Sequence, residues 1–244
     1  MTKELHVRID LTNKVYTNDM GIFPVRSCSG NYFIVLAYHV DSNVILVDPF
    51  QSRHDCHRLA AANRIMSRLQ KNSHSVDLQI LDNKCSTAYK LQIEEKWNST
   101  FQPVPPKMHH RNAAKRMIQT FKSHFLSILY GVSSTFPNLL WDKLLPQTEL
   151  TLNLLRQSKI APAISAWEHF NGPFNFDVTA LAPLGTPIVV HTKPGIHRSW
   201  DFRGRKGFTI GPALEHYCCF QVVDATTKSI FFYDTIEVFH DYLT

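Results

Sequence analysis

The first part of the chain contains three hydrophobic stretches with strand character, followed by one with helical character. Residues 15–25 and 32–40 are rich in β-branched and aromatic residues, and 44–47 follows the polar turn 41–43. Runs of this kind, separated by turn residues, predict a three-stranded antiparallel meander. Hydrophobic residues spaced three and four apart then predict an amphipathic helix over 53–71.

The same pattern continues as an alternation of strands and helices. Residues 76–81 predict a fourth strand that stops at Asp82. Because a helix leads into it, this strand needs a parallel partner, and the sheet is therefore expected to be mixed. The segment that follows is expected to contain a helix over 87–96, a proline-rich extended stretch over 101–106, and helices over 112–130 and 137–157.

Beyond residue 160 the helical period disappears. Residues 161–184 contain prolines, a glycine and aromatic residues without periodicity, which predicts a packed linker. After it come only short strand-like stretches, typical of a small β-barrel. These predicted strands cover 187–191, 207–210, 217–223, 229–233 and 235–239.

Composition narrows the class of protein. Hydrophobic residues make up 44% of the 244 residues, enough for a core, so the chain is not wholly disordered. The net charge of +6 favours polyanionic partners. No apolar run approaches the ~20 residues of a membrane span, and we expect no membrane partner. Five cysteines without paired spacing indicate a reducing compartment, hence a nuclear or cytoplasmic location.

Several segments resemble one protein family in sequence and in order. They are VYTNDMGIFPVRSCSGNYFIVLAYHVDSNVILVDPF, LQILDN, PVPPKMHHRNAAKRMIQTFKSHF, LLPQTELTLNLLR, GTPIVVHTKPGIHRSWDFRGRKGFTIGPA and YDTIEVF. Over 15–239 the chain resembles the integrase region of copia-type retrotransposon polyproteins. The resemblance implies an α/β fold: an RNase H-like mixed five-stranded sheet with flanking helices, followed by a small SH3-like β-barrel. The expected divisions are a leader over 1–13 that can be disordered, a catalytic core-like domain over 14–160, a linker over 161–183 and the barrel over 184–244.

The resemblance also implies a metal site. Such integrases hold two divalent ions, Mg²⁺ or Mn²⁺, with three carboxylates that serve phosphoryl transfer. This sequence carries Asn18, Asp82 and Lys115 at those positions, whose formal charges cancel instead of summing to −3. We therefore expect weak metal binding at Asp82, if any, and impaired strand transfer. Asp19 is a poor substitute because adjacent strand residues point to opposite faces.

Basic residues suggest where nucleic acid would bind. Arg111, Lys115 and Lys122 share one face of the predicted long helix, and a second cluster lies in the barrel with interleaved aromatic side chains. Basic and aromatic residues together suit phosphate contact and base stacking, although a simply solvated face is the plain alternative. The barrel cluster consists of Arg198, Trp200, Arg203, Arg205 and Lys206.

Three other functions stay open at this point. The chain can be an active strand transferase that uses Asp82 and Asp19, a non-enzymatic interaction module, or a decayed element copy. Family resemblance also implies a homo-oligomer with DNA as partner, and no small-molecule cofactor is expected. His54, Cys56 and His57, with His109 and His110, match no standard zinc spacing.

Overall fold

A computed structural model describes residues 13–81, 86–104, 113–191 and 204–238. Its first sheet has the strand order β3-β2-β1-β4-β5. The predicted meander and the mixed character of the sheet are confirmed, since β1, β2 and β3 are antiparallel neighbours while β4 is parallel to both β1 and β5. The strands are β1 (Lys14–Asp19), β2 (Phe33–His39), β3 (Ile45–Phe50), β4 (Leu78–Leu81) and β5 (Thr100–Pro103).

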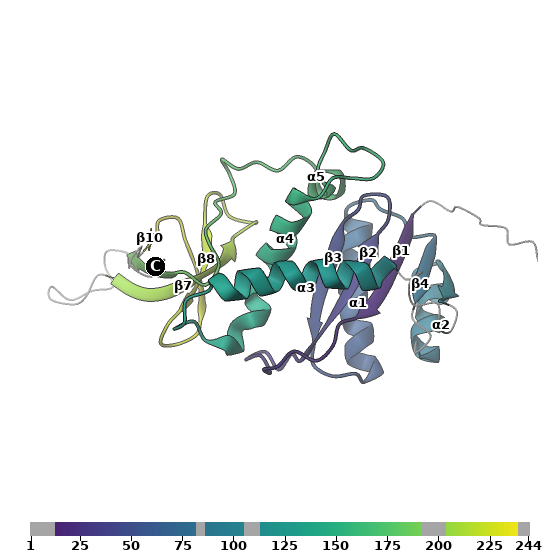
Figure 1. The fold of residues 1–244 in the computed structure, drawn as a ribbon, viewed down its shortest axis with the longest axis horizontal. Coiled ribbons are helices and arrows are strands. Elements are labelled where there is room, and N and C mark those ends of the chain that lie inside the picture. Colours follow the sequence, from purple (N-terminus) through teal and green to yellow (C-terminus); the bar gives the residue numbers. More distant parts are fainter. Residues whose placement is uncertain (1–12, 82–85, 105–112, 192–203, 239–244) are drawn as a thin grey trace, which may run out of the picture.

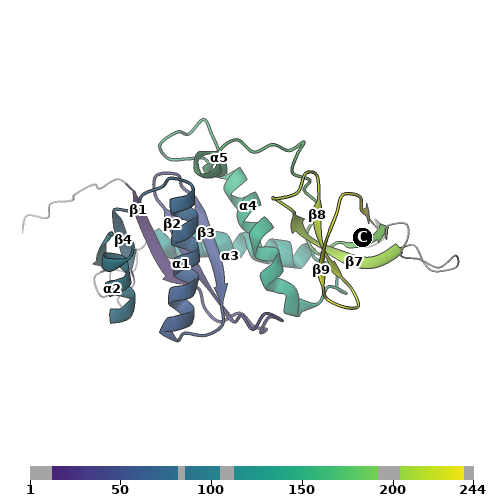
Figure 2. The same ribbon diagram turned by 180° about the vertical axis from the view of Figure 1, so that it is seen from behind.

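Helices cover both faces of this sheet. Figures 1 and 2 show α1 (Asp55–Lys71) on one face and α3 (Ala113–Gly131) crossing the other. The shorter helix α2 (Thr87–Glu95) lies beside β4. The pattern of apolar positions thus places the main helices correctly, within a residue or two of their ends.

Two predictions after α3 are wrong in detail. The single helix expected over 137–157 is a 3₁₀ helix, η2 (Asn138–Leu144), followed by α4 (Leu145–Leu155). Pro146 lies in the first turn of α4, where its missing N–H costs nothing, whereas inside a longer helix it would remove a hydrogen bond. The linker contains a short helix, α5 (Ala166–Asn171), whose first turn is capped by the Ser165 hydroxyl.

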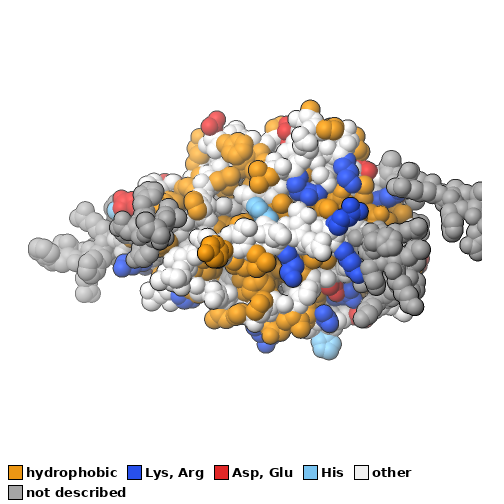
Figure 3. All heavy atoms as spheres, in the orientation of Figure 1, with side chains coloured by type: hydrophobic (Ala, Val, Ile, Leu, Met, Phe, Trp, Pro, Cys, Tyr) orange, Lys and Arg blue, Asp and Glu red, His pale blue; other side chains and the backbone are white. Residues whose placement is uncertain are grey.

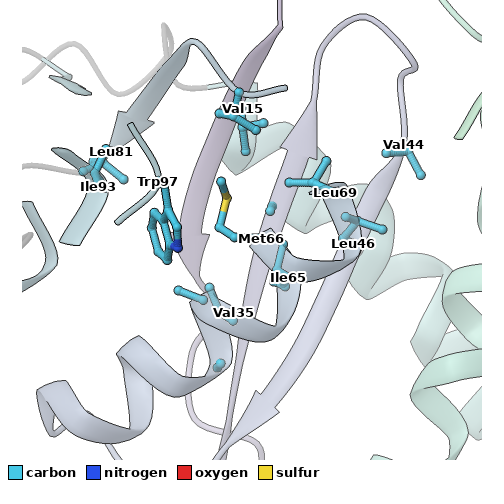
Figure 4. Close-up of a cluster of buried hydrophobic side chains, with 14 of the residues drawn as sticks. Val15, Val35, Val44, Leu46, Ile65, Met66, Leu69, Leu81, Ile93 and Trp97 are labelled. Carbon is cyan, nitrogen blue, oxygen red and sulfur yellow. The ribbon is translucent and has the colours of Figure 1, made fainter. Parts of the chain in front are cut away.

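The sheet separates two hydrophobic clusters. Figure 4 shows the first, in which Ile65, Met66 and Leu69 of α1 pack on Val15, Val35 and Leu46 of the sheet. The second lies on the opposite face, beneath α3 and α4, and includes Phe121, Phe125 and Trp141. It also includes Phe208, Ile210 and Val223 of the second sheet, so one continuous core joins the two sheets.

The second sheet is antiparallel throughout, with the order β10-β6-β7-β8-β9, and lies beyond α4 at one end of the molecule (Figure 1). Five short strands in one sheet agree with the expected barrel-like unit. β8 starts at Phe220 and not at residue 217, because Cys218 adopts a left-handed φ of 49° that breaks the extended run. The strands are β6 (Pro187–His191), β7 (Gly204–Pro212), β8 (Phe220–Asp224), β9 (Ile230–Tyr233) and β10 (Glu237–Val238).

Candidate functional site

The two described positions of the expected metal triad lie on β1 and α3. Tyr16 of β1 packs in the same hydrophobic cluster as Ala113 and Met117 of α3. Since alternate strand residues share a face, Asn18 lies on the α3 side of the sheet, where Lys115 occupies the first turn of the helix. Asp82 lies outside the described residues, directly after Leu81, which pairs with Thr17 of β1.

The chemistry of these side chains does not suit a hard divalent cation. Asn18 supplies one neutral amide oxygen, and that oxygen accepts a hydrogen bond from the Asp19 amide at 2.8 Å. Lys115 supplies an ammonium group, which repels a metal ion. Within the described ranges, no group of three or more His, Cys, Asp or Glu side chains is arranged to hold a metal. Of the expected donor set, then, only Asp82 is a carboxylate.

Asp19 points to the other side of the sheet. Its carboxylate forms an ion pair with Arg58 of α1, with an Nη2–Oδ2 distance of 2.8 Å, and the Arg58 Nε donates to Oδ1 at 3.2 Å. Both side chains are more than four-fifths buried. Because α1 and α3 cover opposite faces, this ion pair holds the Asp19 carboxylate away from Lys115.

The expected nucleic-acid residues fall into two separate groups. Lys115 is half-buried and Lys122 exposed on α3, whereas Arg205 and Lys206 are exposed at the start of β7 in the second sheet. The guanidinium carbon of Arg205 lies 5.9 Å from the centroid of the Phe231 ring. Arg111, Arg198, Trp200 and Arg203 lie outside the described residues, so only part of each predicted cluster can be placed.

The sequence reading missed a further pair of cations beside α3. Arg156 and Lys159 follow α4, and both approach the ring of Tyr38, with the Arg156 Cζ at 6.0 Å and the Lys159 Nζ at 5.1 Å from its centroid. Arg156 also donates to Asn43 and contacts the Met117 sulfur of α3. Figure 3 shows lysine and arginine side chains gathering on this face, around the end of α3 nearest β1. The sequence does contain a signal for this pair, since Arg156 and Lys159 are three residues apart at the end of a predicted helix.

The described residues considered for zinc do not form a metal-binding group. His54 and Cys56 are exposed and His57 is partly exposed at the start of α1, while His109 and His110 lie outside the described residues.

No helix in the described part of the chain is both long and apolar enough to cross a membrane.

Comparison with known proteins gives structural neighbours but no sequence relatives. Neither the protein-family models nor the curated proteins contain a match. The chain is similar to a protein in the cryoEM structure of the simian T-cell lymphotropic virus intasome in complex with PP2A regulatory subunit B56 gamma. That alignment has a TM-score of 0.53 at 14% identity and covers 96% of this chain and 81% of the other.

A second neighbour is the HTLV-2 integrase catalytic core domain in complex with magnesium, in its trimeric form. It aligns with a TM-score of 0.49 at 15% identity and covers 67% of this chain and 100% of the other. The similarity to the intasome protein, which spans both sheets, establishes an integrase-like fold. At this level of identity it speaks for the fold alone.

Proposed function

We propose that this chain is a copia-type, retrotransposon-derived integrase-like protein that binds DNA and has lost efficient metal-dependent strand transfer. The observation that carries the proposal is the pair Asn18 and Lys115, on the strand and the helix where the family resemblance expects carboxylates. The integrase-like fold supports the same assignment, and the proposal takes the second antiparallel sheet to be the SH3-like barrel of the family. A homo-oligomer and a nuclear or cytoplasmic location are part of it.

Electrostatics supports the loss of metal binding. Relative to three carboxylates, the triad positions Asn18, Asp82 and Lys115 have lost three units of negative charge. One unit charge at about 4 Å contributes up to about 4 kcal/mol at an effective dielectric constant of about 20. Facing a dication, a deficit of this size removes most of the affinity. The residues present therefore do not fit the two-metal site of the family.

DNA binding is supported by the cations that the described residues place on the α3 side. Lys115, Lys122, Arg156 and Lys159 lie on or beside α3, and none of them forms an ion pair within the described part of the chain. A lysine at the position of a lost carboxylate can itself meet a phosphate group. Arg205 and Lys206 at the start of β7 offer a further contact region.

The first test is an electrophoretic shift of labelled duplex DNA across a salt series. Replacing Lys115 and Lys122 together by alanine is expected to weaken binding at least ~10-fold at ~100 mM salt and to reduce the salt slope by roughly 2. The matched control replaces Lys71 and Lys96, which are exposed on α1 and after α2, and should leave both quantities nearly unchanged. Absence of binding by the unmodified chain at ~50 mM salt would contradict the proposal.

The second test restores the carboxylates. The double variant Asn18→Asp/Lys115→Glu should gain Mn²⁺ binding, measured by calorimetry, whereas the unmodified chain should show none at the same concentrations. Adding Asp82→Ala to the double variant should abolish that gain. If the unmodified chain instead performs Mn²⁺-dependent strand transfer that Asp82→Ala removes, the chain is an active enzyme and the proposed impairment is wrong.

A further inference from the structure

Three histidines from distant parts of the sequence meet where the segment after α4 returns to the first sheet. His39 ends β2, His74 follows α1, and His169 belongs to α5. The ring centroids of His39 and His74 are 5.2 Å apart, and those of His74 and His169 are 5.9 Å apart. We call these three residues the histidine cluster. Its members link the β2–β3 turn, the loop after α1 and the segment that leads to the second sheet.

The surroundings of His39 favour its neutral form. It is 2% exposed, and its Nδ1 lies 2.8 Å from the Ser42 hydroxyl and accepts from the Ser42 amide at 3.4 Å. A proton on Nδ1 would break the bond from that amide. Nε2 has no hydrogen-bond partner among the described residues, so a positive charge on this ring would be poorly compensated. Burial first, and then the neighbouring His74 and His169, lower the pKa of His39 to about 4, against the opposing effect of Asp41.

The other two histidines attach α5 to the core. The His74 ring stacks on Phe170, with centroids 4.8 Å apart and planes 10° apart, and Phe170 is buried in the cluster under α1. Burial lowers the pKa of His74, although the backbone of Phe170 favours its charged form. The Nδ1 of His169 lies 2.6 Å from the Oγ of Ser158, which is itself buried.

Little negative charge faces these rings. Asp41, on the β2–β3 turn, is the carboxylate that interacts electrostatically with His39 and His74, and its Oδ2 already accepts from the Asn13 amide at 2.6 Å. The carboxylate of Asp77 accepts a hydrogen bond from the side chain of Asn13. The nearby cation, Lys159, directs its Nζ toward the Tyr38 ring. If His39 and His74 were both protonated, they would therefore repel one another with one partly engaged carboxylate beside them.

We propose that the histidine cluster is a pH-sensitive latch, which holds residues 158–171 on the first sheet while His39 and His74 are neutral and releases them when these two rings are protonated. These residues precede the connection to the second sheet, so release loosens the chain between the two sheets. The amides of Lys159 and Ile160, which donate to the Asp41 carbonyl, belong to the same attachment. This inference does not rest on the proposed DNA or metal binding, although the released segment includes Lys159.

The sign of the pH effect follows from the lowered pKa values of His39 and His74. The attached state binds fewer protons than the released state, so attachment is complete above pH ~6.5 and weakens as the pH falls toward 4. Release returns the His39 ring to water and to its ordinary pKa. Between pH 7.5 and 5.0, a pKa of about 4 against 6.5 then shifts the equilibrium toward release about 30-fold from His39 alone.

Hydrogen–deuterium exchange at pH 7.5 and pH 5.0, corrected for the intrinsic pH dependence of exchange, tests the latch. Protection of residues 158–171 should fall at least 10-fold at pH 5.0, while β2 and α3 stay protected. His74→Phe keeps a ring on Phe170 but cannot titrate, and should reduce this pH response. The matched control His191→Asn removes an exposed histidine that pairs with Glu237 of β10, and should leave the response unchanged.

Three outcomes would overturn the latch. They are unchanged exchange protection of residues 158–171 at pH 5.0, a loss of that protection accompanied by an equal loss in β2, and a pH response in His74→Phe as large as in the unmodified chain. If that variant does not fold, an NMR titration of the histidine rings in the unmodified chain decides. Midpoints of His39 and His74 below 6.5 that coincide with changes in α5 support the proposal. Midpoints at or above 6.5 refute it.

Discussion

Helix α4 covers the outer edge of β3 with two polar side chains, and this contact offers a direct test of how the fold is held together. The side chain of Asn153 is fully buried; its Oδ1 accepts from the Ile45 amide at 2.9 Å and its Nδ2 donates to the Ile45 carbonyl at 2.8 Å. One turn earlier, Glu149 accepts from the Val47 amide at 2.7 Å. Glu149 and Asn153 are four residues apart on the helix, a rise of about 6.0 Å, and Val47 and Ile45 are two residues apart on the strand, a rise of about 6.7 Å. The two side chains can therefore reach both strand residues at once.

Replacing Asn153 by leucine should be strongly destabilising. The substitution leaves the buried amide and carbonyl of Ile45 without partners, and each unsatisfied group costs about 1–3 kcal/mol. We expect the free energy of unfolding to fall by about 2–4 kcal/mol, which is a large part of the stability of an ordinary domain. Glu149→Gln should cost less, because the amide oxygen can still accept from Val47 while only the ion pair with Arg68 is lost.

Urea unfolding followed by tryptophan fluorescence measures this loss. The control is Asn171→Leu, since Asn171 is exposed and its side chain hydrogen-bonds, among the described residues, to the side chain of Asn72 alone. Its free energy change should stay within about 0.5 kcal/mol. A cost below about 1 kcal/mol for Asn153→Leu, with an unchanged dependence on urea concentration, would refute the idea that α4 closes the sheet edge through these bonds.

Two further predictions concern the second sheet. Gly207→Ala should lower the melting temperature and reduce the free energy of unfolding by about 1–3 kcal/mol, because the new Cβ would lie 2.7 Å from the carbonyl oxygen of Val223. The control is Gly131→Ala, whose Cβ would meet nothing within 4 Å, and it should be neutral or slightly stabilising. Burial alone would raise the pKa of Asp224, but hydrogen bonds from the backbone, Thr227 first, lower it below its ordinary value. The stability it contributes is therefore present above pH ~4 and lost as the pH falls further, so Asp224→Ala should flatten the acid side of a stability–pH curve; an unchanged curve would contradict this.

The family resemblance and the hydrophobic pattern together anticipated the mixed sheet, the long helix α3 and the second sheet, because these depend on local periodicity and on the rule that a crossover helix joins parallel strands. Asn18 and Lys115 could be singled out in the same way, since their significance lies in residue type at a motif position. The break at Pro146 was also readable, because a proline without an N–H favours the first turn of a helix, although the sequence reading treated 137–157 as continuous.

Other features depend on contacts between residues far apart in the chain, and only the tertiary structure decided them. Asp19 is held by Arg58 from another element, and Asn153 reaches a strand that lies 108 residues earlier. The three histidines come together only when the β2–β3 turn, the loop after α1 and helix α5 have packed. Local sequence specifies which element a residue joins, whereas its partners, burial and proton affinity arise from the packing of those elements against one another.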